Sequence, residues 1–142
     1  MIEEIKFKKK LYAIIVRNKF SKDGAYFLTK SSLSQQMAHM KYKKGHEIKS
    51  HSHERWIRKI STTAEVLFIK KGKLRIDFYS TKGKYFLSKV LSEKDVVLFI
   101  YGGHGFEVIK NVSMIEIKQG PFTKDTRKFF PSVNKKELKI RK

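Results

Sequence analysis

The stretch that decides the fold runs from residue 65 to residue 109 and reads EVLFIKKGKLRIDFYSTKGKYFLSKVLSEKDVVLFIYGGHGFEVI. Short runs rich in Val, Ile, Leu, Phe and Tyr are separated by glycine-containing turn signals, at Lys71-Gly72, Lys82-Gly83 and Gly102-Gly103. None of these runs has the helical period of an amphipathic helix, so each is expected to form a β-strand. Many short strands without interleaved helices predict an all-β antiparallel sandwich or barrel.

The strand pattern extends on both sides of this stretch. The expected strands are residues 10–17, 36–43, 65–70, 73–79, 85–91, 95–100, 105–109 and 113–119. Short helices are expected only at residues 31–36 and in the tail. Because the pattern stops near Gly120-Pro121, we predict a β domain with an N-terminal strand over residues 1–122, followed by a basic C-terminal tail over residues 123–142.

Composition restricts the class of protein. The 142 residues include 33 Lys and Arg against 13 Asp and Glu, a net charge of +20, and no cysteine. The lack of cysteine excludes disulfides, thiolate metal sites and cysteine nucleophiles. No apolar run is long enough for a membrane span or a secretory signal, so we expect a soluble, cytoplasmic chain.

The positive charge makes nucleic acid, an anionic membrane surface and a phosphorylated ligand candidate partners. Lysine supplies 27 of the 33 basic residues. Readers of bases rely on the planar fork of arginine, and no recognition helix or zinc-finger spacing is present. We therefore predict no specific nucleic-acid partner, and interpret the lysines as a solvated surface or as an attraction for an anionic ligand.

Three of the five histidines form a pattern with chemical content. His51 and His53 are two residues apart, so in a strand they lie on one face. His104 stands in a glycine-rich turn after an apolar strand, and Glu65 opens another apolar strand. A carboxylate there requires an ion pair, for instance with Arg58, or a metal. Three histidines and a carboxylate suit divalent Mn, Fe, Zn, Ni or Co.

Two motifs resemble those of the cupin superfamily. The first runs from Gly45 through His51-Ser52-His53 to Glu65 and Gly72, and the second runs from Asp95-Val96-Val97-Leu98-Phe99 to Gly102-Gly103-His104. The resemblance implies an antiparallel double-stranded β-helix, or jelly roll, with a divalent transition metal inside the barrel. The implied metal ligands are His51, His53, Glu65 and His104. The chain departs from the family in its longer segment 54–64 and in a second motif without proline.

Further stretches resemble single-domain cupins associated with surface-polysaccharide and sugar-nucleotide genes. They are SQQ at 34–36, EVLFI at 65–69, RIDFY at 75–79, GGHGFE at 102–107 and MIEIKQGP at 114–121. This resemblance implies a sugar or a sugar nucleotide as the small-molecule ligand.

We therefore expect a metal-dependent enzyme of surface-polysaccharide biosynthesis that acts on a sugar or sugar nucleotide as an isomerase or epimerase. The candidate acid–base residues are Tyr101 and Glu65. The candidate substrate-binding residues are Lys118, Gln35 and Arg75. Two alternatives use the same site: a non-catalytic, metal-dependent sugar-binding module and an Fe(II) dioxygenase.

Strand parity adds finer expectations. It places Glu107 on the face opposite His104, and it makes Arg75 and Asp77 a local ion pair. Lys118 shares a face with Glu116, and it would meet an anionic group if that face is the interior. Exposed edge strands require cover, so the strand at 10–17 is expected to pair with a second copy in a homodimer.

Overall fold

The computed structural model describes every residue except 123, 125, 129–132 and 142. Its strands are β1 (Ile2–Phe7), β2 (Lys10–Val16), β3 (Gly24–Phe27), β4 (Ala38–Lys41), β5 (Glu65–Tyr79), β6 (Tyr85–Ser92), β7 (Val96–Phe99) and β8 (Gly103–Lys118). One 3-10 helix, η1 (Lys135–Glu137), is the only helical element in the described part of the chain, and no helix there is long and apolar enough to cross a membrane. The predicted all-β class is confirmed.

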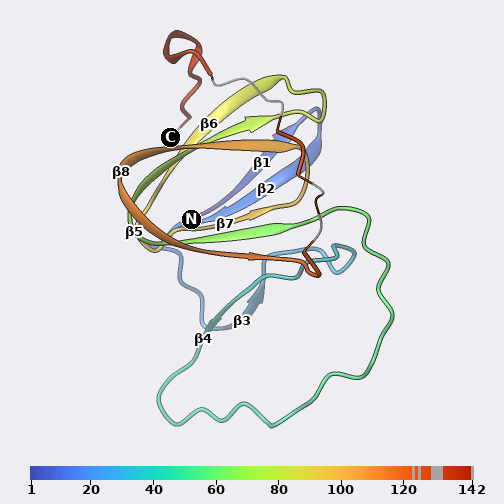
Figure 1. Ribbon diagram of the computed structural model, residues 1–142. Coiled ribbons are helices and arrows are strands. Elements are labelled where there is room, and N and C mark those ends of the chain that lie inside the picture. The colour runs from blue at the N-terminus through green and yellow to red at the C-terminus, as the bar shows by residue number, and fades with distance from the viewer. Residues whose placement is uncertain (123, 125, 129–132, 142) are drawn as a thin grey trace.

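Strand β5 organises the main sheet. One of its edges pairs with β7 through residues 65–68 and with β6 through residues 73–79, while β8 pairs with the other edge over almost its whole length. The strand order is β1-β2-β7-β5-β6, all pairs are antiparallel, and β3 and β4 form a separate hairpin. Figure 1 shows the main sheet curled strongly on itself into a half-barrel.

The curl depends on a bend within β5. The sequence predicts two strands separated by a turn at Gly72, whereas the structure has one strand with register shifts between Ile69 and Leu74. Gly72 has φ +95°, and a Cβ there would collide with the carbonyl of Asn111 on β8. The glycine therefore bends the sheet by allowing close backbone approach, rather than ending the strand. The expected strands at 105–109 and 113–119 likewise merge into β8.

Other differences from expectation lie near the N-terminus. Strands β1 and β3 were not predicted, and the expected helix at 31–36 is a series of turns and bends. The Gln36 amide holds these turns, because it accepts from the Thr29 hydroxyl (3.0 Å) and donates to the Leu33 carbonyl (2.7 Å). A side chain that satisfies loop backbone in this way competes with helix formation.

The core lies on the inner side of the curl. Alternate residues of the paired strands face it, and its buried members include Ala13, Ile15, Leu67, Ile69, Leu74, Ile76, Phe78, Leu91 and Val97. This alternation places one face of β5 in the core and leaves the other face for polar contacts. The same parity determines which side chains reach the concave face.

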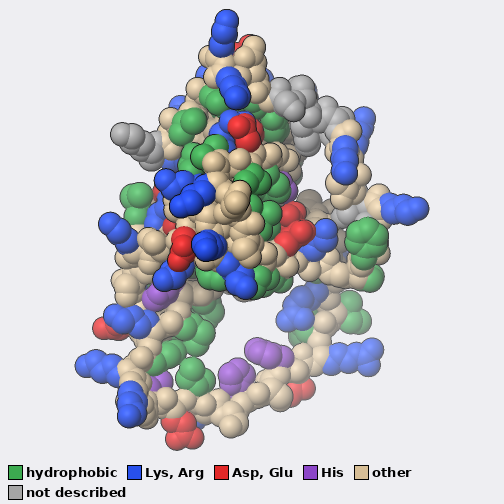
Figure 2. All heavy atoms as spheres, turned by 60° about the vertical axis from the view of Figure 1, so that its left-hand side comes forward, with side chains coloured by type: hydrophobic (Ala, Val, Ile, Leu, Met, Phe, Trp, Pro, Cys, Tyr) green, Lys and Arg blue, Asp and Glu red, His purple; other side chains and the backbone are tan. Residues whose placement is uncertain are grey.

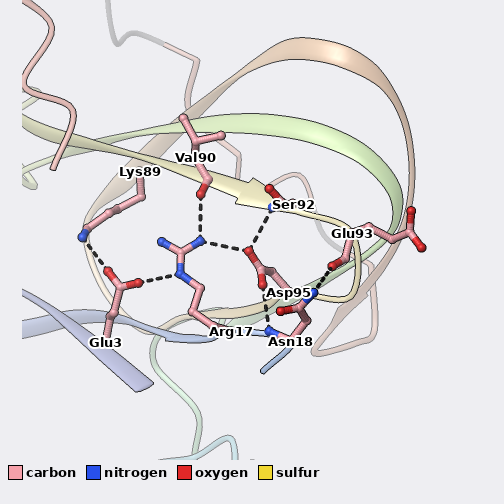
Figure 3. A network of polar contacts seen from close by, with 8 residues as sticks. All are labelled: Glu3, Arg17, Asn18, Lys89, Val90, Ser92, Glu93 and Asp95. Carbon is pink, nitrogen blue, oxygen red and sulfur yellow. Dashed lines mark hydrogen bonds and ion pairs between the residues drawn. The ribbon is translucent and has the colours of Figure 1, made fainter. Parts of the chain in front are cut away.

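A network of buried charges joins elements that are distant in the sequence. The Arg17 guanidinium contacts Glu3 (2.5 Å) and Asp95 (2.9 Å), and Glu3 also contacts the Lys89 ammonium (2.5 Å). Arg17 further donates to the Val90 carbonyl, and the Asp95 carboxylate accepts from the backbone amides of Ser92 and Asn18 (Figure 3). Two cations balance two anions, so the network holds β1, β2 and β6 together without a net buried charge.

The end of the chain returns to the sheet. Residues 139–141 form a parallel bridge with Ser88 of β6: the Ser88 amide donates to the Lys139 carbonyl (3.0 Å), and the Arg141 amide donates to the Ser88 carbonyl. The Lys139 amide also donates to the Tyr85 hydroxyl (2.8 Å). The described end of the basic tail thus extends the β6 edge. Parts of the predicted tail, at 123, 125, 129–132 and 142, lie outside the described residues.

Candidate functional site

Glu65 and His104 meet on the concave face of the half-barrel. Glu65 begins β5, opposite Lys118 of β8, and His104 lies at the other end of β8, opposite Phe78. Because β8 curls, its two halves turn side chains toward the same interior. The Glu65 Oε2 atom lies 3.5 Å from His104 Nε2, and both side chains are largely buried.

Two further charged side chains complete this cluster. Glu116 is close enough to Glu65 for a hydrogen bond between the two carboxyl groups, and it also acts electrostatically on His104. The Lys118 ammonium lies 3.2 Å from Glu116. We call Glu65, His104, Glu116 and Lys118 the interior cluster. It combines a hydrogen-bonding imidazole, two carboxyl groups and one ammonium.

The environment changes the proton affinity of Glu65. Burial, and to a smaller extent the neighbouring Glu116 carboxyl, raise the pKa of its carboxyl to about 7, against an opposing effect of Lys118. A carboxyl of this pKa gains and loses a proton near neutral pH, as general acid–base chemistry requires.

Burial has the opposite effect on the imidazole. It lowers the pKa of His104 to about 4, against a smaller raising effect of Glu116. The ring stacks on Phe99, with centroids 4.1 Å apart, and also contacts Phe106. His104 is therefore neutral at physiological pH and carries one donor and one acceptor nitrogen.

The cluster opens into a cavity of about 680 Å³ whose wall includes Glu65, His104, Lys118, Phe99 and Tyr101. An adjoining hollow of about 1010 Å³ shares the first three of these residues and reaches Arg75. Cavities of this size accommodate a small molecule. Polar groups on an apolar, aromatic floor suit a ligand with hydroxyl groups and a hydrophobic ring face.

Tyr101 lies at the rim of this cavity. The Lys10 ammonium is 3.2 Å from the centroid of its ring, and the ring meets Tyr12 edge-on. Hydrogen bonding and charge attraction from Lys10 lower the pKa of the Tyr101 phenol. The predicted catalytic Tyr101 and Glu65 thus line the same cavity.

Arg75 has partners of its own. Its guanidinium donates to both carboxylate oxygens of Asp77 (2.9 and 3.0 Å) and pairs with Glu107 (2.5 Å). The predicted Arg75–Asp77 ion pair is confirmed, and it is buried rather than exposed. This pairing stabilises the outer side of β5, and any ligand contact by Arg75 would compete with two carboxylates.

Gln35 lies apart from the cavity. It occupies a bend between β3 and β4 and is half-buried, and it does not line either hollow described above. Lys118, by contrast, lines both hollows, and its side chain is 42% exposed.

His51 and His53 lie on the segment between β4 and β5. Their rings are 5.4 Å apart, and the His51 Nδ1 atom lies 3.0 Å from the Lys49 carbonyl. Both residues are exposed, and the segment swings in a wide arc away from the half-barrel (Figure 1). The space-filling view shows open space between this arc and the body of the protein (Figure 2).

The four predicted metal ligands therefore lie as two separate pairs. Glu65 and His104 are adjacent, whereas His51 and His53 lie together elsewhere. Among the described residues, no three His, Asp or Glu side chains converge as a metal site requires. As placed here the four side chains do not fit one ion, and their joint ligation stays a prediction through which no chemical step is derived.

The sequence did not identify Glu116 as a site residue. Its spacing from Lys118 indicates a shared face, but its approach to Glu65 depends on the pairing of β5 with β8. Comparisons with family models, with curated proteins and with solved structures find no match for this chain. The fold and the site define the class: an antiparallel half-barrel with an acid–base cluster on its concave face.

Proposed function

We propose that this protein is a cupin-like jelly roll that binds a sugar or sugar nucleotide on its concave face and isomerises or epimerises it. The observation that carries the proposal is the contact of Glu65 with His104, at 3.5 Å, in the wall of a cavity large enough for a sugar. The curled antiparallel sheet and the two cupin-like motifs support the fold assignment.

The proposed chemistry needs a group that moves a proton at the carbon next to a carbonyl. The Glu65 carboxylate takes that proton, the electron pair of the C–H bond moves toward the carbonyl oxygen, and an enediol-like state results. For isomerisation, the same carboxyl returns the proton to the neighbouring carbon. Epimerisation requires a second proton donor on the opposite face of the enediol-like state, because a carboxyl on one side reaches only that side. The His104 imidazole holds the Glu65 carboxyl in place, and Tyr101 is positioned to donate to a ligand oxygen.

Recognition of the ligand uses the remaining groups of the cavity. The Lys118 ammonium is a partner for a phosphate or carboxylate, with Glu116 positioning it. Phe99 and Phe106 offer apolar surface for a sugar ring. A net charge of +20 favours approach of an anionic, nucleotide-linked sugar.

The experiment is incubation with a panel of keto-sugar nucleotides in D2O, followed by NMR. Deuterium incorporation next to the carbonyl, together with an isomerised product, is expected for the wild type and lost in Glu65→Gln. The matched control is Glu93→Gln, an exposed residue of the turn between β6 and β7 (Figure 3). Tight binding without exchange would assign a sugar-binding module instead, and oxygen consumption with added iron would assign a dioxygenase.

A divalent metal held by His51, His53, Glu65 and His104 is the second part of the proposal and is tested separately. Elemental analysis of the wild type is compared with His51→Ala and His104→Ala. About one transition metal per chain, lost in both variants, would support joint ligation. Loss in His104→Ala alone would restrict the metal to the interior cluster, and an absence of binding would remove the metal from the proposal.

A further inference from the structure

Residues 55–60, with the sequence RWIRKI, expose apolar and basic side chains together on the segment between β4 and β5. Ile57 is 87% exposed, the highest value among the large apolar side chains of the described residues, and Trp56 is 75% exposed. Ile60 is also exposed. Apolar side chains presented side by side to water mark a surface that a partner covers.

The charges around these side chains have one sign. Arg55, Arg58 and Lys59 are all exposed, and residues 55–60 contain no acidic side chain. The wider stretch 43–60 carries six basic residues against two acidic ones, namely Lys43, Lys44, Lys49, Arg55, Arg58 and Lys59 against Glu47 and Glu54. The complementary partner is therefore anionic.

From these observations we propose that residues 55–60 dock the protein on an anionic lipid surface. The indole of Trp56 would lie at the level of the headgroups, with Ile57 and Ile60 at the boundary with the acyl chains. Arg55 and Arg58 would contact lipid phosphates. The arc stands away from the half-barrel, so a flat surface can reach it (Figure 2). Ile60 also lines the cavity beside the interior cluster, but the inference does not rest on the proposed reaction.

The side chains favour lipid over the other anionic partner, nucleic acid. Single-stranded nucleic acid is held by stacking of bases on aromatic faces. Here two of the three exposed apolar side chains, Ile57 and Ile60, are aliphatic and have no π-face, whereas hydrocarbon receives them well. A second copy of the same segment would bring like charges together, which opposes self-association at this site.

Trp56 is the only tryptophan of the chain, so its fluorescence reports on this segment alone. The protein is mixed with vesicles of phosphatidylcholine and phosphatidylglycerol, or with vesicles of phosphatidylcholine only. We expect a blue shift of the emission and co-sedimentation with the anionic vesicles, both reversed by salt. Equal binding to the neutral vesicles, or no blue shift on binding, would overturn the proposal.

The apolar contribution is tested with Ile57→Ser combined with Ile60→Ser, which keeps Trp56 as the reporter. The matched control is Phe27→Ser combined with Met40→Ser, which removes two exposed apolar side chains from the β3–β4 hairpin. Weaker vesicle binding is expected only for the isoleucine pair. Equal loss in both pairs would overturn the assignment of residues 55–60.

The basic contribution is tested with Arg55→Gln combined with Arg58→Gln. The control, Lys82→Gln combined with Lys84→Gln, removes the same charge from the exposed β5–β6 turn. The arginine pair should bind anionic vesicles about thirtyfold more weakly, and the lysine pair far less so. Equal weakening would assign binding to overall charge. Tighter binding of an oligonucleotide than of vesicles, or a concentration-dependent dimer lost in the isoleucine variant, would also overturn the proposal.

Discussion

The carboxyl of Glu65 and the imidazole of His104 lie 3.5 Å apart, and burial moves their proton affinities in opposite directions. It raises the pKa of the carboxyl to about 7 and lowers the pKa of the imidazole to about 4. Both shifts favour the uncharged form. Two groups that would form an ion pair in water are therefore held as a neutral acid beside a neutral base until the pH approaches 7.

Glu65→Gln removes one of these titrations. Between its ordinary pKa of 4.5 and about 7, folded Glu65 holds a proton that the unfolded chain has lost, so this residue makes wild-type stability fall as pH rises. The variant lacks this decrease in stability. Relative to that of the wild type, its free energy of unfolding should therefore increase by about 1–2 kcal/mol across this pH window, a figure reduced for partial solvation of the side chain. Urea denaturation at both ends of the window measures the difference, and a constant difference would contradict the prediction.

His104→Gln removes a dependence of stability on pH that has the opposite sign. Between its ordinary pKa of 6.5 and about 4, His104 stays neutral in the folded state while the unfolded chain binds a proton. The stability that His104 contributes is thus complete above pH 6.5 and is lost as pH falls. As the pH falls from 6.5 to about 4, the free energy of unfolding of the variant should increase by about 2–3 kcal/mol relative to that of the wild type. A proton NMR titration in which the His104 ring changes near pH 6.5 would contradict this.

The close backbone approach at Gly72 makes it the most sensitive glycine of the bend. Gly72→Ala introduces a Cβ that collides with the Asn111 carbonyl and strains a backbone at φ +95°, so unfolding should become easier by about 2–4 kcal/mol. Gly45→Ala is the control, because its φ is +87° but the space around it is open. Denaturant titration should show a clearly smaller loss for Gly45→Ala, and equal losses would assign the effect to φ alone.

The buried network around Arg17 should be costly to break. Asp95→Ala leaves the Arg17 guanidinium without one of its two carboxylates and removes the acceptor of two backbone amides, so we expect a loss of about 3–5 kcal/mol. The control is Asp23→Ala, whose ion pair with Lys41 is solvent-exposed. That change should cost less than about 1 kcal/mol, as measured by thermal or urea unfolding. Similar losses in the two variants would show that the network contributes little to the stability of the fold.

Local patterns account for what could be predicted of the fold. Apolar runs such as those in β2, β6 and β7 indicate strands because a short run of β-branched and aromatic residues between turn signals is a local property of the chain. The reliance on local patterns also explains why Gly72 was wrongly predicted to end a strand. A local signal marks a change of backbone direction, but whether the strand ends or bends depends on the neighbouring strand.

The structure brings four of the predicted site residues together. Glu65, His104, Tyr101 and Lys118 were identified as candidates from strand parity, the glycine-rich turn and the cupin-like motifs, and all four line one cavity. Glu116 was not identified, because only the antiparallel register brings it to Glu65.

The sequence by itself determined the all-β class, the alternation of faces along each strand and the positive charge, because each of these depends on neighbouring residues or on composition. Only the tertiary structure decided that the curl of the sheet brings the two ends of β8 near each other. As a result, Glu65 lies beside His104 and Glu116. The tertiary structure also decided that His51 and His53 lie on an exposed arc. The physical reason is that the register between distant strands is set by packing and by backbone approach at bends, and neither is a local property of the chain.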